Sequence, residues 1–123
     1  MRQGIIVLLA GSTFCCACLA SLAEWQDFSG RYTIFAGDQV AGREAPTPTD
    51  RKLAIAVKGQ VAKDLFDSIG PDVQPTCSGE DGDRSRRKQG VQCSYNAKGA
   101  AHGYRCWIGM DLRTGESTAV VSC

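Results

Sequence analysis

Four widely spaced cysteines in the second half of the chain, Cys77, Cys93, Cys106 and Cys123, constrain the fold more than any other feature. The chain contains seven cysteines, and the other three lie near its beginning. An even set of four in a small exported domain predicts two disulfides. A zinc site is the disfavoured alternative, because the spacing contains no C-x-x-C pair and the single histidine is His102. We therefore expect a disulfide-braced fold with no cofactor and no metal.

The beginning of the chain has the pattern of a signal peptide. Arg2 is followed by a run without charge that lasts until Glu24, and the first half of this run is strongly apolar. Ser21 and Ala23 are small residues at the positions expected before a cleavage site. We therefore predict a signal peptide at residues 1–23.

Two alternatives for this leader remain open. The uncharged run approaches the length of about 20 apolar residues that a membrane-spanning helix needs, but Gly11 and Thr13 dilute it and no basic cluster follows it. A lipid anchor at Cys18 is the other alternative, although only the nearest residues fit the bacterial consensus. In the preferred interpretation, residues 24–123 form a single domain in the periplasm or outside the cell.

The charge balance argues against nucleic acid or an anionic membrane as the partner. The sequence has 14 basic and 13 acidic residues, and loss of Arg2 with the leader makes the two numbers equal. Bulk electrostatic binding to either kind of partner depends on a clear basic excess. Neither kind of partner is therefore expected.

Hydrophobic periodicity predicts one helix and several strands. Val61, Leu65, Phe66 and Ile69 form one apolar stripe of a helix that ends before Pro71. Other segments have the alternation and the β-forming residues of strands. They are residues 31–35, 53–57, 86–95, 103–110 and 117–123. The expected fold is α+β, with one short helix on an antiparallel sheet of about four to five strands and a C-terminal three-stranded meander.

The hairpin of residues 86–95 and 103–110 can be aligned, because antiparallel partners keep a constant sum of residue numbers. A turn centred after Gly99 pairs Cys93 with Cys106. The Cys93 side of the hairpin is then apolar and is expected to pack on the helix, with Trp107 on the other side. A second turn, centred after Arg113, places the final strand beside residues 103–110.

The connectivity of the disulfides is open. The pairs Cys77–Cys93 and Cys106–Cys123 close the shortest loops without crossing, and are slightly preferred on that ground. The strand register supports a different pairing, because the directly opposed Cys93 and Cys106 can bond to each other and leave Cys77 to Cys123.

Trp107 has two interpretations. Large aromatic residues are usually mostly buried, so the aromatic segment at residues 25–35 could fold across the sheet and enclose Trp107 in a second small core. Alternatively, Trp107 is an exposed anchor with Val120 beside it and Arg105 two residues away, a composition typical of protein interfaces.

The loop at residues 79–90 places acidic residues before basic ones. Such a dipolar loop could contact an acidic groove of a partner through Asp83, Arg84, Arg86 and Lys88. A solvated loop that leads into a charged strand edge is the other interpretation. A calcium site is disfavoured, because the D-x-D-x-D-G spacing and the closing glutamate of an EF-hand are absent.

The sequence favours a small exported protein that binds another protein. Its layout of leader, short helix, strand meander and four cysteines resembles small exported bacterial proteins, some of which inhibit lysozymes or neutralise delivered toxins. That resemblance implies an inhibitor or immunity-type protein against an envelope-active hydrolase. The expected contact residues are Trp107, Arg105, Val120, Asp83, Arg84, Arg86 and Lys88.

Two other functions stay open. One is a small secreted hydrolase that uses clustered carboxylates or His102, and the other is a structural or accessory component of the envelope. No serine motif such as G-x-S-x-G accompanies His102, so the chain lacks a recognisable nucleophile and base. Binding is therefore favoured over catalysis.

Overall fold

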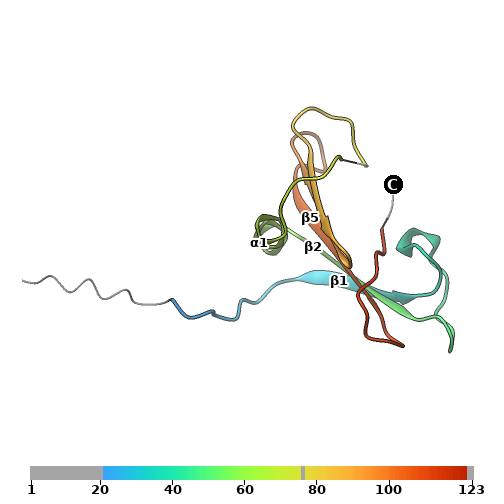
Figure 1. Ribbon diagram of the computed structural model, residues 1–123. Coiled ribbons are helices and arrows are strands. Elements are labelled where there is room, and N and C mark those ends of the chain that lie inside the picture. The colour runs from blue at the N-terminus through green and yellow to red at the C-terminus, as the bar shows by residue number, and fades with distance from the viewer. Residues whose placement is uncertain (1–20, 76, 122–123) are drawn as a thin grey trace, which may run out of the picture.

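The computed structural model describes residues 21–75 and 77–121 (Figure 1). Residues 21–29 have no regular secondary structure and extend away from the sheet (Figure 1). The regular elements follow in the chain as β1 (Gly30–Phe35), the 3-10 helix η1 (Val40–Gly42), β2 (Lys52–Lys58), α1 (Gln60–Ser68), β3 (Arg84–Lys88), β4 (Val91–Asn96) and β5 (Gly103–Asp111).

The strands form one antiparallel five-stranded sheet in the order β1-β2-β5-β4-β3. Helix α1 follows β2 after a single residue and packs on one face of the sheet, whereas the chain after β5 lies on the other side (Figure 1). The predicted α+β class, with one helix on an antiparallel sheet, is confirmed.

The core between α1 and the sheet has the composition that the sequence predicts. Phe66 and Ala62 of the helix are fully buried against Val57, Cys93 and Cys106. Residues of the predicted helix stripe flank this cluster, because side chains four residues apart share one face of a helix. The helix therefore uses its apolar stripe to cover the Cys93 side of the sheet.

The register of β4 and β5 is also as predicted. Cys93 pairs with Cys106 and Gln92 pairs with Trp107. Because neighbouring residues of a strand point to opposite faces, this register puts the two cysteines under α1 and Trp107 on the far face.

The disulfide joins Cys93 to Cys106, with a Cα–Cα distance of 4.1 Å. The slightly preferred connectivity, Cys77–Cys93 with Cys106–Cys123, is therefore wrong. The strand register explains the pairing, since it holds the two cysteines directly opposite each other. Cys77 lies in the loop before β3, but Cys123 is outside the described residues, so the second disulfide stays a prediction.

The predicted strand at residues 86–95 is wrong as a single strand. It consists of β3 and β4, which form a hairpin that turns at Gln89 and Gly90. An added Cβ at Gly90 would lie 2.6 Å from the carbonyl oxygen of Gly109, so the turn fits closely against β5 only because glycine stands there.

The predicted final strand beside β5 is also wrong in its described part. Ser117 forms a single bridge to Met110, and the residues that follow have no strand structure up to residue 121. The predicted meander fails because its two side positions on β5 belong to β4 and β2. The alternating pattern after Ser117 instead serves to insert Val120, which is 3% exposed, into a core on the far face.

This second core consists of Phe35, Ala54 and Val120, with Val40 and Trp107 packed around it. The backbone of Val40 donates a hydrogen bond to the carbonyl oxygen of Val120 at 3.0 Å. The chain can cross the sheet here because Gly109 has no side chain in the way. The sheet is therefore stabilised by two hydrophobic clusters, one on each face.

Candidate functional site

Trp107 lies on β5, on the face of the sheet away from the helix. It is paired with Ala56 of β2, and its side chain packs against the core of Phe35, Ala54 and Val120. Its side chain is only partly buried and also lines two surface cavities. Trp107 thus combines a packing role with an accessible surface.

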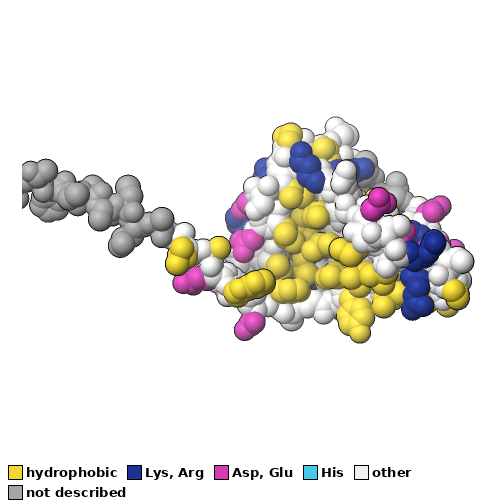
Figure 2. Space-filling model, turned by 60° about the horizontal axis from the view of Figure 1, so that its bottom comes forward, with side chains coloured by type: hydrophobic (Ala, Val, Ile, Leu, Met, Phe, Trp, Pro, Cys, Tyr) yellow, Lys and Arg dark blue, Asp and Glu magenta, His cyan; other side chains and the backbone are white. Residues whose placement is uncertain are grey.

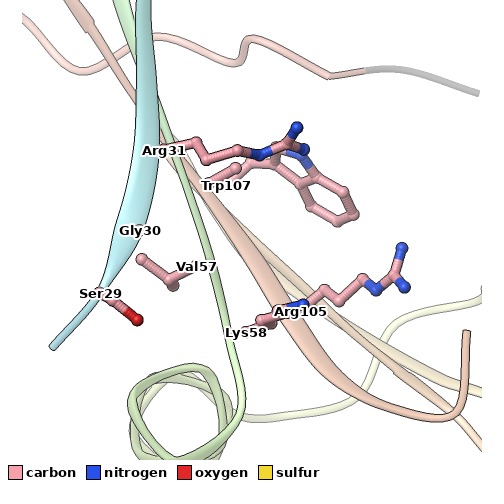
Figure 3. A pocket seen from close by; sticks show the side chains of 8 residues that line it. Ser29, Gly30, Arg31, Val57, Lys58, Arg105 and Trp107 are labelled. Atoms are coloured by element: carbon pink, nitrogen blue, oxygen red, sulfur yellow. The ribbon is translucent and has the colours of Figure 1, made fainter.

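The first of these cavities, which we call the Trp107 pocket, has a volume of about 490 Å³. Its floor includes the small side chain of Ala56, which leaves space next to the indole of Trp107. In Figure 3 the indole lies between the guanidinium groups of Arg31 and Arg105. The full lining is Ser29, Gly30, Arg31, Ala56, Val57, Lys58, Arg105 and Trp107.

Three cations from three different strands meet at the Trp107 pocket. Arg31 of β1 is paired with Ala56, and Lys58 of β2 is paired with Arg105 of β5, so all three side chains share the face of Trp107. Within the described part of the chain, none of the three forms an ion pair. Their positive charges are therefore available to a ligand.

A second cavity of about 570 Å³ continues from the Trp107 pocket along the same face. It shares Arg31, Ala56 and Trp107 with the pocket and runs between β1 and residues 40–45. Together the two cavities form one depression that extends over β1, β2 and Trp107 of β5.

Arg84 and Arg86 occupy the opposite face of the sheet. Their guanidinium carbons lie 5.0 and 4.4 Å from the ring centroid of Phe66, and Arg86 donates a hydrogen bond of 2.8 Å to the Phe66 carbonyl oxygen. Both also bond to Asp72, Arg84 at 2.7 and 3.0 Å and Arg86 at 2.6 Å. These two arginines therefore connect β3 to the helix and to the loop that follows it.

The hydrogen bonds of Arg84, and next those of Arg86, lower the pKa of Asp72 from 3.8 to about 2. The charged form of Asp72 accepts bonds that its protonated form cannot, which is why the pKa falls. Asp72 was not among the contact residues predicted from the sequence. Its role as the ionic partner of Arg84 and Arg86 has only a weak sequence signal, because it is one carboxylate in a polar loop.

Asp83 also has an internal role. Its carboxylate accepts hydrogen bonds from the hydroxyl of Ser78 and from the backbone of Ala97, the latter at 2.8 Å. The Ser78 bond is the main reason that its pKa is lowered. Asp83 thus ties the loop before β3 to the end of β4.

The expected contact residues therefore do not form one surface. Trp107 and Arg105 lie together on one face, whereas Arg84 and Arg86 lie on the other, and the exposed Lys88 ends β3 on the helix side. Val120 is buried and not accessible to a partner. The structure adds Arg31 and Lys58 to Trp107, which no local pattern could indicate, because the pairing of β1 with β2 crosses a long loop.

Four carboxylates have a resolved pKa shift, and none of these four suits the role of a general acid. The resolved pKa shifts of Asp50, Asp67, Asp72 and Asp83 are all downward, so each is held ionised, whereas a catalytic acid needs a raised pKa. His102 is exposed in the β4–β5 turn, with its ring edge-on to Tyr95 at 6.0 Å.

The described residues contain neither a metal-binding cluster nor a helix that could span a membrane. Three or more metal-binding side chains do not cluster anywhere among them. Nor does any helix in residues 21–75 and 77–121 have the length and apolar character that crossing a membrane requires.

Comparisons with known proteins do not assign this chain to a family. No family model, no curated protein and no solved structure matches it.

Proposed function

We propose that this chain is a binding protein, and that an acidic segment of another protein lies across the Trp107 face of the sheet. The observation that carries this proposal is the set of three cations, Arg31, Lys58 and Arg105, around the accessible indole of Trp107. None of these cations has an ion-pair partner among the described residues.

The chemistry of the Trp107 pocket suits a carboxylate next to an apolar side chain. A guanidinium group binds a carboxylate through two parallel hydrogen bonds, and two such groups flank the indole here. Tryptophan contributes a large apolar contact area and is enriched among the residues that dominate binding energy. Because the net charge of the whole chain is close to zero, the attraction depends on this local group.

The class of partner follows from the same chemistry. Hydrolases that cleave glycans carry paired carboxylates in their clefts, and an acidic segment beside such a cleft would suit the arginines around Trp107. We infer that the partner is an envelope-active hydrolase and that this chain acts as an inhibitor or immunity-type protein.

We also propose that the protein works in the periplasm or outside the cell after removal of residues 1–23. The Cys93–Cys106 disulfide supports an oxidising compartment, where such bonds persist. Sequencing the N-terminus of the exported protein tests this step, and we expect it to begin at Glu24. An exported protein that retains Met1 would contradict the cleavage.

Synthetic peptides provide a direct test of the binding site. The Trp25→Phe variant leaves Trp107 as the only tryptophan, so its fluorescence reports on the pocket. We expect an alternating Glu-Leu peptide to change this fluorescence and a Lys-Leu peptide of the same length to have little effect. Reversal of two charges, Arg31→Glu with Arg105→Glu, should weaken binding by about tenfold or more.

Arg51→Glu is the matched control, because Arg51 is an exposed cation that lines neither cavity. Equal binding of both peptides, or equal weakening by the control and the double variant, would contradict the proposal. Inorganic phosphate could also displace the Glu-Leu peptide completely when both are present at the same concentration of negative charge. That result would identify a simple anion site instead. The same variants then serve as baits in an envelope extract, where a true partner is retained by the wild type and lost by the double variant.

A further inference from the structure

The strand β1 forms one edge of the sheet, and its outer side has no neighbouring strand in the described part of the chain. Its apolar side chains Tyr32 and Ile34 are 75% and 37% exposed. A free edge of this kind is a template for pairing with another strand, and natural proteins usually protect it. β1 therefore presents an unprotected strand edge that is able to pair with another strand.

The hydrogen bonds of β2 show which groups of β1 are free. Gly59 donates to Tyr104 and Arg51 accepts from Leu112, so the odd-numbered residues of β2 bond to β5 and the even-numbered ones bond to β1. Arg31 and Thr33 pair with even-numbered residues of β2. The backbone groups of the intervening residues, Gly30, Tyr32 and Ile34, therefore point outward from the sheet.

The free part of this edge has a defined length. At its C-terminal end, the amide of Ala36 donates a hydrogen bond of 3.0 Å to the carbonyl oxygen of Glu44, which occupies the next outward position. At the other end, β1 begins at Gly30. The free segment Gly30–Ile34 is thus centred on Tyr32.

The opposite edge of the sheet is protected. The amide of Val73 donates a hydrogen bond of 2.8 Å to the carbonyl oxygen of Ser85 in β3, and cationic side chains occupy most of this strand. Lysine and arginine on an edge strand discourage pairing. The only cation in the free segment of β1 is Arg31.

We propose that two copies of this chain associate by antiparallel pairing of their β1 strands, with Tyr32 on the two-fold axis. This register places Gly30 opposite Ile34 of the second copy and uses every outward backbone group of the segment, which gives about six hydrogen bonds. Arg31 then lies opposite Thr33 rather than opposite its own copy. The two Tyr32 rings meet across the axis, and aromatic pairs of this kind stabilise a sheet.

The apolar surface next to β1 supports a second copy as the occupant. Tyr32 is in register with Ile55 and Ile108, and Ile34 is in register with Leu53 and Met110. Ile55 also packs against the core under α1, whereas Tyr32, Ile34 and Met110 remain exposed. Figure 2, which brings the bottom of Figure 1 forward, shows a continuous apolar area on the face that it presents. Pairing of β1 joins two such areas on one face, because cross-strand partners share a face.

The dimer has a consequence for the other face of the sheet. Gly30 and Arg31 line the Trp107 pocket, so the pairing brings two pockets close to the dimer axis on one surface. Two adjacent sites can raise the apparent affinity for a partner that carries two acidic segments. The dimer itself does not depend on what the pockets bind.

Sedimentation velocity of the oxidised protein tests the proposal. Small interfaces associate weakly, so the concentration series should reach about 1 mM. We expect a monomer–dimer equilibrium that Tyr32→Lys shifts at least about tenfold toward monomer, because like charges would face each other on the axis. Met110→Lys is the matched control, since it adds the same charge to the same apolar face, two strands away from the edge.

Hydrogen exchange of the wild type tests the register without any variant. The amides of Tyr32 and Ile34 should become protected as the concentration rises, whereas the amide of Arg31 is already bonded within the monomer. A protein that stays monomeric, or outward amides that stay unprotected in a dimer, would overturn the proposal. Equal disruption by Tyr32→Lys and Met110→Lys would assign the interface to the apolar face and also overturn the edge pairing.

Discussion

The guanidinium of Arg86 lies 4.4 Å from the ring centroid of Phe66, the aromatic residue at the centre of the helix–sheet core. Arg86 belongs to the edge strand β3. It also donates a hydrogen bond to the carbonyl oxygen of Phe66, near the C-terminal end of α1. The charged edge strand, which the sequence presents as a contact surface, is therefore the part of the sheet that secures the helix.

Replacement of Arg86 should destabilise the fold. Arg86→Ala removes a cation–π contact and a charged hydrogen bond, and we expect the free energy of unfolding to fall by about 1–3 kcal/mol. Chemical denaturation followed by circular dichroism measures this change. Lys88→Ala, at an exposed position of the same strand, is the control and should change stability by less than about 0.5 kcal/mol. Similar losses in the two variants would argue against a specific role for Arg86.

Asp72 should make the free energy of unfolding depend on pH in the acidic range. Its pKa is about 2 in the folded chain and near its ordinary value of 3.8 after unfolding, because the two arginines no longer bond to it. Its contribution is therefore complete above pH 3.8 and is lost as the pH falls toward about 2. Urea unfolding at several pH values should show a difference between the wild type and Asp72→Asn that shrinks over this range.

Asp81→Asn is the control for this pH dependence, because Asp81 is exposed and forms no ion pair within the described residues. A constant difference between the wild type and Asp72→Asn from pH 5 to pH 2 would show that ionisation of Asp72 does not stabilise the fold.

Gly109 should be intolerant of any side chain. An added Cβ would lie 2.2 Å from the carbonyl oxygen of Thr118 and 2.4 Å from a methyl group of Val120. We expect Gly109→Ala to cost about 1–3 kcal/mol and to speed hydrogen exchange at the amide of Val40, which bonds to Val120. Gly79→Ala, where an added Cβ meets nothing within 4 Å, should be nearly neutral.

The Cys93–Cys106 bond should contribute to stability and be detectable directly. Peptide mapping without reductant should recover the two cysteines in one linked product. Replacing both by alanine should lower the free energy of unfolding by about 2–4 kcal/mol, because the bond restricts the unfolded chain. Recovery of Cys93 linked to Cys77 would contradict the pairing.

The sequence alone determined the helix and the β4–β5 hairpin of this protein, but not the turn at Gln89 and Gly90 that divides the predicted strand at residues 86–95. The stripe from Val61 to Ile69 identified the helix, and the alternation on either side of Gly99 placed Cys93 opposite Cys106. These features depend on contacts between residues close in the sequence. Periodicity and the constant sum of a hairpin register are therefore sufficient to predict them.

Only the tertiary structure decided what lies beside β5 and what surrounds Trp107. β2 occupies the position on β5 that was predicted for residues 117–123. It thereby places Lys58 opposite Arg105, and its pairing with β1 adds Arg31 to the same face. Alternation shows that a strand has two faces, but it does not specify which distant strand becomes its neighbour. That choice depends on burying Val57 under the helix and Val120 over Gly109, and such packing involves the whole chain at once.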